Sequence, residues 1–297
     1  MKKILLITNI LSVFTLFSCT DLDLNPLSEG SSGSWYSTQQ EIEMSVNDFY
    51  RTDFFPIDDM SWGDDMTARN STSNVQNGTM TAEDGTVATR WQNYYKGIAR
   101  ALRLLKNMEN ARAMGVTEAK ITQYEGEAYF YIGYAYGMLA FHWGDAILDK
   151  TGMTLDEAYS IARSPKAEVL AYSYECLEEA AKRLPTTYSG IQRATKGAAF
   201  AFKARIAIWN NDYETAATAA KACMDLDVYK LHNNYQNLFT ASWSDEWIFF
   251  FRGDVTLKKY YWAGGDVLNT ISRLSGGWGG QKAPSYELVC AYPCIDG

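Results

Sequence analysis

The loop at residues 58–70 combines an aromatic ring, carboxylates and a guanidinium group in a short stretch. In "DDMSWGDDMTARN", Trp62 is followed by Asp64, Asp65 and Arg69. An indole face can stack on the C–H faces of a sugar ring, and charged side chains can hydrogen-bond to sugar hydroxyl groups. The alternative is a solvated loop that is anchored by one tryptophan. Because loops often carry binding residues, we take these four residues as a candidate ligand site.

A second aromatic cluster lies in a glycine-rich segment near the carboxyl end of the sequence. Tyr260, Tyr261 and Trp262 are followed by Trp278. Aromatic residues belong to a core more often than to a site, so packing is the alternative here as well. These four residues form the second set of candidate ligand contacts.

The loop at residues 58–70 also contains pairs of acidic residues, which invite comparison with a glycoside hydrolase. Hydrolysis of a glycosidic bond uses two carboxyl groups across a cleft, about 5 Å or about 6.5–9.5 Å apart. Neighbouring acids on one loop, such as Asp64 and Asp65, seldom face each other in that way. The chain also has only two histidines, which excludes a site with several histidine ligands. We therefore expect no catalytic residue, no metal and no cofactor.

The acidic balance of the chain argues against a nucleic-acid partner. Its 297 residues hold 27 Lys and Arg against 35 Asp and Glu, which gives a formal net charge of −8. Binding to nucleic acid needs basic side chains that neutralise phosphates, and the sequence has no Lys- or Arg-rich run. Hydrophobic residues make up 47% and charged residues 21%, values typical of a folded globular protein.

The amino terminus has the features of a bacterial lipoprotein signal. Lys2 and Lys3 precede an apolar run, and "LFSC" at residues 16–19 resembles a lipobox. We expect residues 1–18 to be removed as a signal peptide and Cys19 to carry acyl chains. Several acyl chains give lasting membrane attachment, whereas one chain does not. The acidic segment that follows is expected to be a lipid-anchored tether over residues 19–40.

Hydrophobic periodicity predicts a series of helices from residue 41 onward. Apolar residues recur at spacings of three and four in each of these segments. The expected helices cover residues 41–51, 86–114, 117–143, 165–184, 193–210 and 212–226. A long loop is expected at residues 52–82, and a short strand at residues 246–251.

The expected helix at residues 117–143 has the composition of a buried element. Its second half carries no formal charge, and Gly126, Gly133 and Gly137 share one face. Small residues on such a face allow a neighbouring backbone to approach closely, and a helix that is apolar on most sides is buried. We expect His142 on this helix to be a hydrogen-bonded core residue.

The helix pair within residues 194–226 is similar to a tetratricopeptide unit, in which small residues lie where two helices cross. Units of this kind bury their apolar faces by stacking. The expected fold is therefore mostly α, a tetratricopeptide-like scaffold of helical hairpins (an α-α superhelix) with long loops and a few short strands.

Several segments, in this order, together resemble the SusD/RagB family of glycan-binding outer-membrane lipoproteins of Bacteroidetes. Their order and spacing are specific to this family. The segments that carry the resemblance are the lipobox Cys19 with "DLDLNPLS", "WQNYYKGIARALRLLKNM" (91–108), "GEAYFYIGYAYGMLAFHWGD" (126–145), "SPKAEVLAYSYECLEEAAKRLP" (164–185), "ATKGAAFAFKARIAIWNNDYETAATAAKACMD" (194–225), "SDEWIFFF" (244–251) and "PSYELVCAYPCIDG" (284–297).

The resemblance implies a non-catalytic lipoprotein at the surface of the outer membrane. Such a protein binds an oligo- or polysaccharide and delivers it to a SusC-like TonB-dependent outer-membrane barrel for uptake. Family members continue well past the "DG" at Asp296 and Gly297. We therefore expect residues 41–297 to form the helical domain, with the carboxyl-terminal part of the family fold missing.

Three other functional classes stay open at this point. A tetratricopeptide-type scaffold would bind a protein and no sugar, a related lipoprotein could bind peptides, and a glycoside hydrolase would release reducing ends. Binding to a panel of polysaccharides separates these classes.

The expected lipid anchor gives a direct prediction. Cys19→Ala removes the sulfur that would carry an acyl chain, so the variant should move from the membrane fraction to the soluble fraction after cell lysis. Immunoblotting of both fractions, beside the unmodified chain, measures this shift. A variant that stays in the membrane fraction contradicts the assignment of Cys19.

Overall fold

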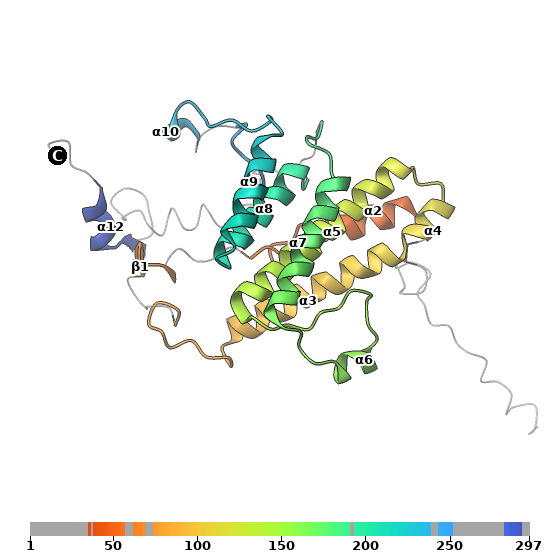
Figure 1. The fold of residues 1–297 in the computed structure, drawn as a ribbon, viewed down its shortest axis with the longest axis horizontal. Helices are drawn as coiled ribbons and strands as arrows, with labels where there is room; N and C mark the ends of the chain where they lie inside the picture. Colours follow the sequence, from red (N-terminus) through yellow and green to blue (C-terminus); the bar gives the residue numbers. More distant parts are fainter. Residues whose placement is uncertain are drawn as a thin grey trace, which may run out of the picture.

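Helices dominate the structure, which confirms the expected mostly helical fold of tetratricopeptide-like hairpins (Figure 1). The computed structural model describes residues 35–36, 38–56, 62–68, 74–190, 193–238, 243–251 and 282–292. The main helices are α2 (Gln39–Asn47), α3 (Gly85–Lys106), α4 (Met108–Ala113), α5 (Glu118–Trp143), α7 (Lys166–Arg183), α8 (Lys196–Trp209) and α9 (Tyr213–Met224).

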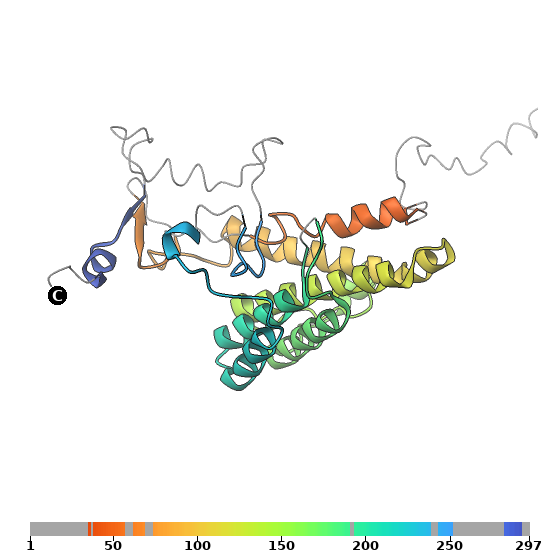
Figure 2. The same cartoon turned by 90° about the horizontal axis from the view of Figure 1, so that it is seen from above.

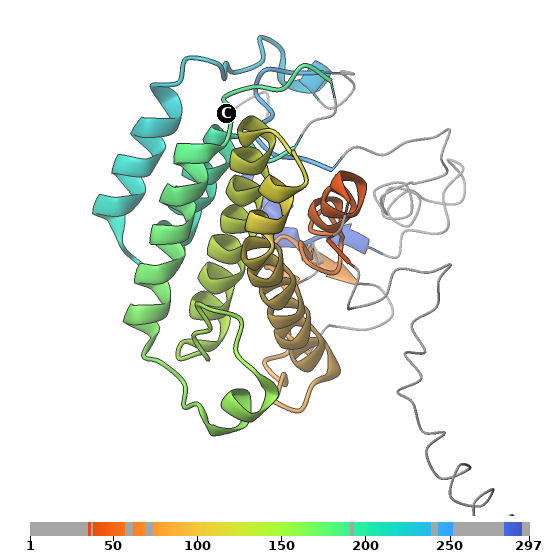
Figure 3. The same cartoon turned by 90° about the vertical axis from the view of Figure 1, so that its right-hand side faces the viewer.

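Helix α5 is the central element of the helical body. It packs against α3 on one side and against α7 and α8 on the other, while α8 and α9 form the next hairpin. Figure 3 shows these helices following one another across the molecule. Nearly every α5 residue from Tyr124 to Ala140 is buried. The uncharged sequence of its second half therefore reflects contact with neighbours on all sides.

The glycines of α5 lie where neighbouring helices come closest, as the sequence predicts. A Cβ atom on Gly133 would lie 2.9 Å from the backbone oxygen of Ser173 and 3.0 Å from the backbone nitrogen of Leu177. The Ser173 hydroxyl also donates a hydrogen bond of 2.6 Å to the Gly133 carbonyl. One turn further on, a Cβ atom on Gly137 would meet Ile206 of α8. These glycines thus set the distance from α5 to α7 and α8.

Helix α2 and the segment after it cover a further face of α5. Phe49, Phe54 and Phe55 are buried and pack around Tyr131, with ring centroids 5.5–5.7 Å apart. Helix α2 begins at Gln39 with a capping box, and Tyr36 before it is only 7% exposed. The expected tether covers residues 19–40, and its described end, with Tyr36, lies against the helical body. Residues 19–34 lie outside the described residues.

The structure corrects two details of the helix prediction. The single helix expected at residues 86–114 is divided into α3 and α4 at Asn107, whose side-chain amide donates to the Arg103 carbonyl (2.8 Å) and competes with the helical ladder. His142 is exposed and is not a core residue, because it lies in the last turn of α5, just before the chain leaves the helix at Gly144.

The remaining elements are short and lie at the edge of the helical body. They are α6 (Leu155–Ser160), α10 (Tyr235–Leu238), α12 (Tyr286–Ala291) and two strands, β1 (Met66–Ala68) and β2 (Lys282–Pro284). The strands pair antiparallel, with Met66 opposite Pro284, and lie beyond one end of the helices (Figure 2). The expected strand at residues 246–251 is absent from the described residues 243–251, which form turns. Phe249 and Phe251 of this segment pack on the helical core, and no described strand lies beside it.

Among the described residues, no helix combines the length and the apolar character that crossing a membrane requires.

The close approach at Gly133 gives a prediction about stability. Gly133→Ala places a methyl group against the α7 backbone, and overpacking of this kind lowers the free energy of unfolding by about 1–3 kcal/mol. Urea unfolding followed by circular dichroism measures the change. Gly85→Ala, at the start of α3, is the matched control because its new methyl group meets no atom within 4 Å. Equal stability of both variants would contradict the packing described for α5.

Candidate functional site

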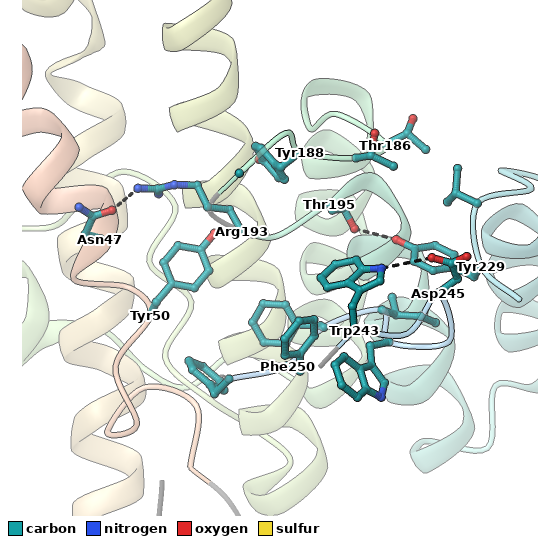
Figure 4. Close-up of a pocket in the computed structure, with 17 residues that line it drawn as sticks. Asn47, Tyr50, Thr186, Tyr188, Arg193, Thr195, Tyr229, Trp243, Asp245 and Phe250 are labelled. Carbon is teal, nitrogen blue, oxygen red and sulfur yellow. Dashed lines mark hydrogen bonds between the residues drawn. The ribbon is translucent and has the colours of Figure 1, made fainter. Parts of the chain in front are cut away.

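A pocket of about 870 Å³ opens between the helical body and the segment at residues 243–251 (Figure 4). Four stretches that are far apart in the sequence form its walls. They are the end of α2 with Tyr50, the connection between α7 and α8, the segment after α9, and residues 243–251. The pocket is large enough for a small organic ligand, since such sites span about 300–1,000 Å³.

One wall of the pocket is aromatic. Trp243, Trp247 and Phe250 contact each other, with ring centroids 5.1–6.4 Å apart. Trp243 is 48% exposed, and its indole nitrogen donates to the Asp245 carboxylate at 3.2 Å. An exposed indole beside a carboxylate offers a flat apolar face and a hydrogen-bond acceptor next to each other.

The opposite wall is polar and is fixed by a buried charge. The Arg193 guanidinium donates to Glu127 of α5 at 2.8 Å, donates to Asn47 of α2 and lies over the Tyr50 ring. The Tyr50 hydroxyl donates to the same Glu127 carboxylate at 2.6 Å and accepts from the Ala194 N–H at 2.9 Å. Three segments of the chain therefore meet at the Glu127 side chain, which is fully buried.

The surroundings of this wall shift the pKa values of its groups. Burial raises the pKa of Glu127, while Arg193, Tyr50 and Gln123 act in the opposite direction by stabilising the carboxylate. Burial also opposes the charge of Arg193, but Glu127, Tyr50 and Tyr188 together outweigh burial, so the pKa of Arg193 is raised. The pKa of Tyr50 lies well above its ordinary value because of burial and the nearby carboxylate. Tyr50 therefore stays a neutral hydrogen-bond donor.

The floor of the pocket is tied to the start of α8. Thr195 caps this helix by accepting from the Ala198 N–H at 3.1 Å, and its hydroxyl also shares a hydrogen bond of 2.9 Å with Tyr229. A Cβ atom on Gly197 would lie 2.2 Å from the Tyr229 hydroxyl oxygen, so glycine makes room for the Tyr229 ring. These contacts hold the segment after α9 against α8.

The candidate residues from the first aromatic loop lie away from this pocket. The Trp62 ring packs under the Arg90 guanidinium at 4.5 Å, and Asp64 and Asp65 are exposed. Arg90 lines a second, shallower hollow of about 350 Å³, together with Asp53. The segment at residues 47–56 borders both hollows. Arg69, Cys19 and the second aromatic set (Tyr260, Tyr261, Trp262 and Trp278) lie outside the described residues.

None of the described residues that line the pocket was a candidate on sequence grounds. The sequence around Tyr50, Arg193 and Glu127 has the pattern of ordinary helices and loops. It contains no motif that indicates a binding role for these three residues. A usable signal was the pair of tryptophans at 243 and 247, which flank Asp245 at the start of the strand expected at residues 246–251.

Comparison with known proteins places the chain in a family. Residues 36–208 match the model of the SusD-like family described as "Starch-binding associating with outer membrane". SusD-like protein P2 of Formosa agariphila is 25% identical over 256 residues, which cover 80% of this chain and 50% of that protein. The chain spans about half the length of the curated relatives it matches.

Solved structures show the same fold. A SusD-like carbohydrate-binding protein from Bacteroides fragilis superposes with a TM-score of 0.73 at 21% identity, over 89% of this chain and 55% of that one. A laminarin-binding SusD-like protein gives a TM-score of 0.61 at 21% identity, over 70% of this chain and 49% of that one. Because the family model covers more than half of the sequence, the chain belongs to the SusD-like family.

Proposed function

We propose that this protein binds oligo- or polysaccharides in the pocket beside Trp243 and Trp247 and does not transform them. The observation that carries the proposal is the aromatic wall, with the exposed Trp243 and the half-buried Trp247, which faces a polar wall built on Arg193. Sugar rings have apolar C–H faces and a rim of hydroxyl groups, so a site that recognises them needs both kinds of surface.

The family supports a saccharide as the ligand. Its model is described as starch-binding, and one structural relative binds laminarin. Starch and laminarin are therefore the first glycans to test with this chain. The absence of catalysis is part of the proposal, since Asp245 is the one acid among the described residues that line the pocket. Glycoside hydrolysis needs two carboxyl groups across a cleft.

The cellular role follows from the same proposal. Cys19 would hold the protein at the outer membrane through its acyl chains, facing the outside of the cell. The bound glycan would pass to a SusC-like TonB-dependent barrel for nutrient uptake. The family description, which names association with the outer membrane, supports this location.

Substitution of the pocket tryptophans tests the proposed site. Trp243→Ala and Trp247→Ala should each weaken binding of the preferred glycan by about 1–3 kcal/mol, the range for loss of an aromatic stacking partner. Affinity electrophoresis on a panel of polysaccharides identifies the glycan, and calorimetric titration with a soluble oligosaccharide of it gives the affinities. Tyr159→Ala on α6 is the control, because this exposed tyrosine is not among the pocket residues.

The same titration decides between the pocket and the aromatic loop. If Trp62→Ala weakens binding and both pocket variants bind like the unmodified chain, the site lies at the loop and not in the pocket. Release of reducing ends by the unmodified protein would contradict the claim that it performs no chemistry.

A further inference from the structure

We infer that the pocket selects uncharged glycans and rejects anionic ones such as uronate-rich or sulfated polysaccharides. This inference rests on the proposed function and concerns the charge class of its ligand. It follows from the two charged side chains among the described pocket residues. Arg193 is paired with a protein carboxylate, whereas Asp245 faces the ligand.

The cation of the pocket is already neutralised by the protein. Among the described residues that line the pocket, Arg193 is the one cationic side chain. Its guanidinium is bound to the buried Glu127 carboxylate and to the Asn47 side chain, and only 13% of the side chain is exposed. An anionic ligand would have to compete with a carboxylate that lies 2.8 Å away and is also held by Tyr50 and Gln123. Arg193 therefore does not provide a site for a carboxylate or a sulfate.

The acid of the pocket keeps its negative charge at the aromatic wall. Asp245 is exposed, and its carboxylate accepts a hydrogen bond from the neutral indole N–H of Trp243 at 3.2 Å. A neutral hydrogen-bond donor leaves the charge of a carboxylate in place. A second anion stacked on Trp243 would be repelled, and this repulsion is screened less inside a pocket than in open water.

The same groups favour neutral sugars. A carboxylate accepts hydrogen bonds from hydroxyl groups, and these charge-assisted bonds are stronger than bonds between neutral groups. Asp245 is thus placed to bind sugar hydroxyls next to the Trp243 face. The chain as a whole carries a net charge of −8, which adds a long-range repulsion for polyanions at low ionic strength.

The test compares a neutral polysaccharide with its own anionic derivative. Soluble starch and laminarin are each paired with a sulfated derivative, beside a panel that also contains polygalacturonate, at pH 8 and low salt. The high pH favours the charged form of Glu127, whose pKa is raised by burial and lowered by Arg193, Tyr50 and Gln123. The unmodified protein should bind a neutral polysaccharide at least about tenfold more tightly than its sulfated derivative, a difference of about 1.4 kcal/mol.

Two variants assign this selectivity to the pocket. Asp245→Asn removes the exposed charge and should lower the ratio of neutral to anionic affinity by roughly tenfold or more. Glu127→Gln leaves Arg193 without its carboxylate and should lower the same ratio. Circular dichroism checks whether Glu127→Gln, a change at a buried position, still folds. If it does not fold, Asp245→Asn alone decides the test. The control is Glu179→Gln on α7, an acid paired with Lys182 and Arg183 outside the pocket, which should leave the ratio unchanged.

The outcomes separate the inference from the proposed function. Preference of the unmodified chain for polygalacturonate or a sulfated derivative overturns the inference while glycan binding stands. An unchanged ratio in Asp245→Asn and in a folded Glu127→Gln also overturns it, because the selectivity would then come from elsewhere. Absence of binding to every polysaccharide of the panel overturns the proposed function, and with it the inference.

Discussion

The packing of helix α5 is the constraint on which the rest of the structure depends. This helix is buried on nearly all sides, so each neighbour must meet a face that fits it. Glycines at 133 and 137 allow α7 and α8 to come close, and Tyr131 on another face gathers the aromatic side chains that follow α2. The hairpins on one side and the amino-terminal segment on the other are thus positioned by one element.

Helix α5 also positions the polar wall of the pocket. It does so through the charge of Glu127 and not through apolar contacts. Glu127 binds Arg193 from the α7–α8 connection and Tyr50 from the segment after α2. A buried carboxylate is unfavourable unless it is paired and hydrogen-bonded, which ties these two segments to α5. The polar wall is therefore preorganised before a ligand arrives. The aromatic wall faces it from residues 243–251, which also insert Phe249 among the core rings.

The sequence predicts the helices well and the site poorly, for physical reasons. Helix periodicity and the glycine face of α5 are local patterns, and each matches the structure closely. The pocket instead joins Tyr50, Arg193 and Trp243, which only tertiary packing brings together. The strand expected at residues 246–251 reflected an aromatic run, but Phe249 and Phe251 pack on the helical core while Trp247 and Phe250 line the pocket. Strands β1 and β2 are also hard to predict, because each has only three residues and more than half of the chain separates them in sequence. Neither strand therefore shows a recognisable local sequence pattern.

The central claim is that a glycan binds between the aromatic and polar walls. Hydrogen–deuterium exchange with mass spectrometry, with and without a saturating soluble oligosaccharide of the preferred glycan, tests it most directly. The account predicts slower exchange at residues 243–251 and in the α7–α8 connection, since both line the pocket and would lose contact with water. Slower exchange at residues 62–68 alone, with the pocket segments unchanged, would contradict it.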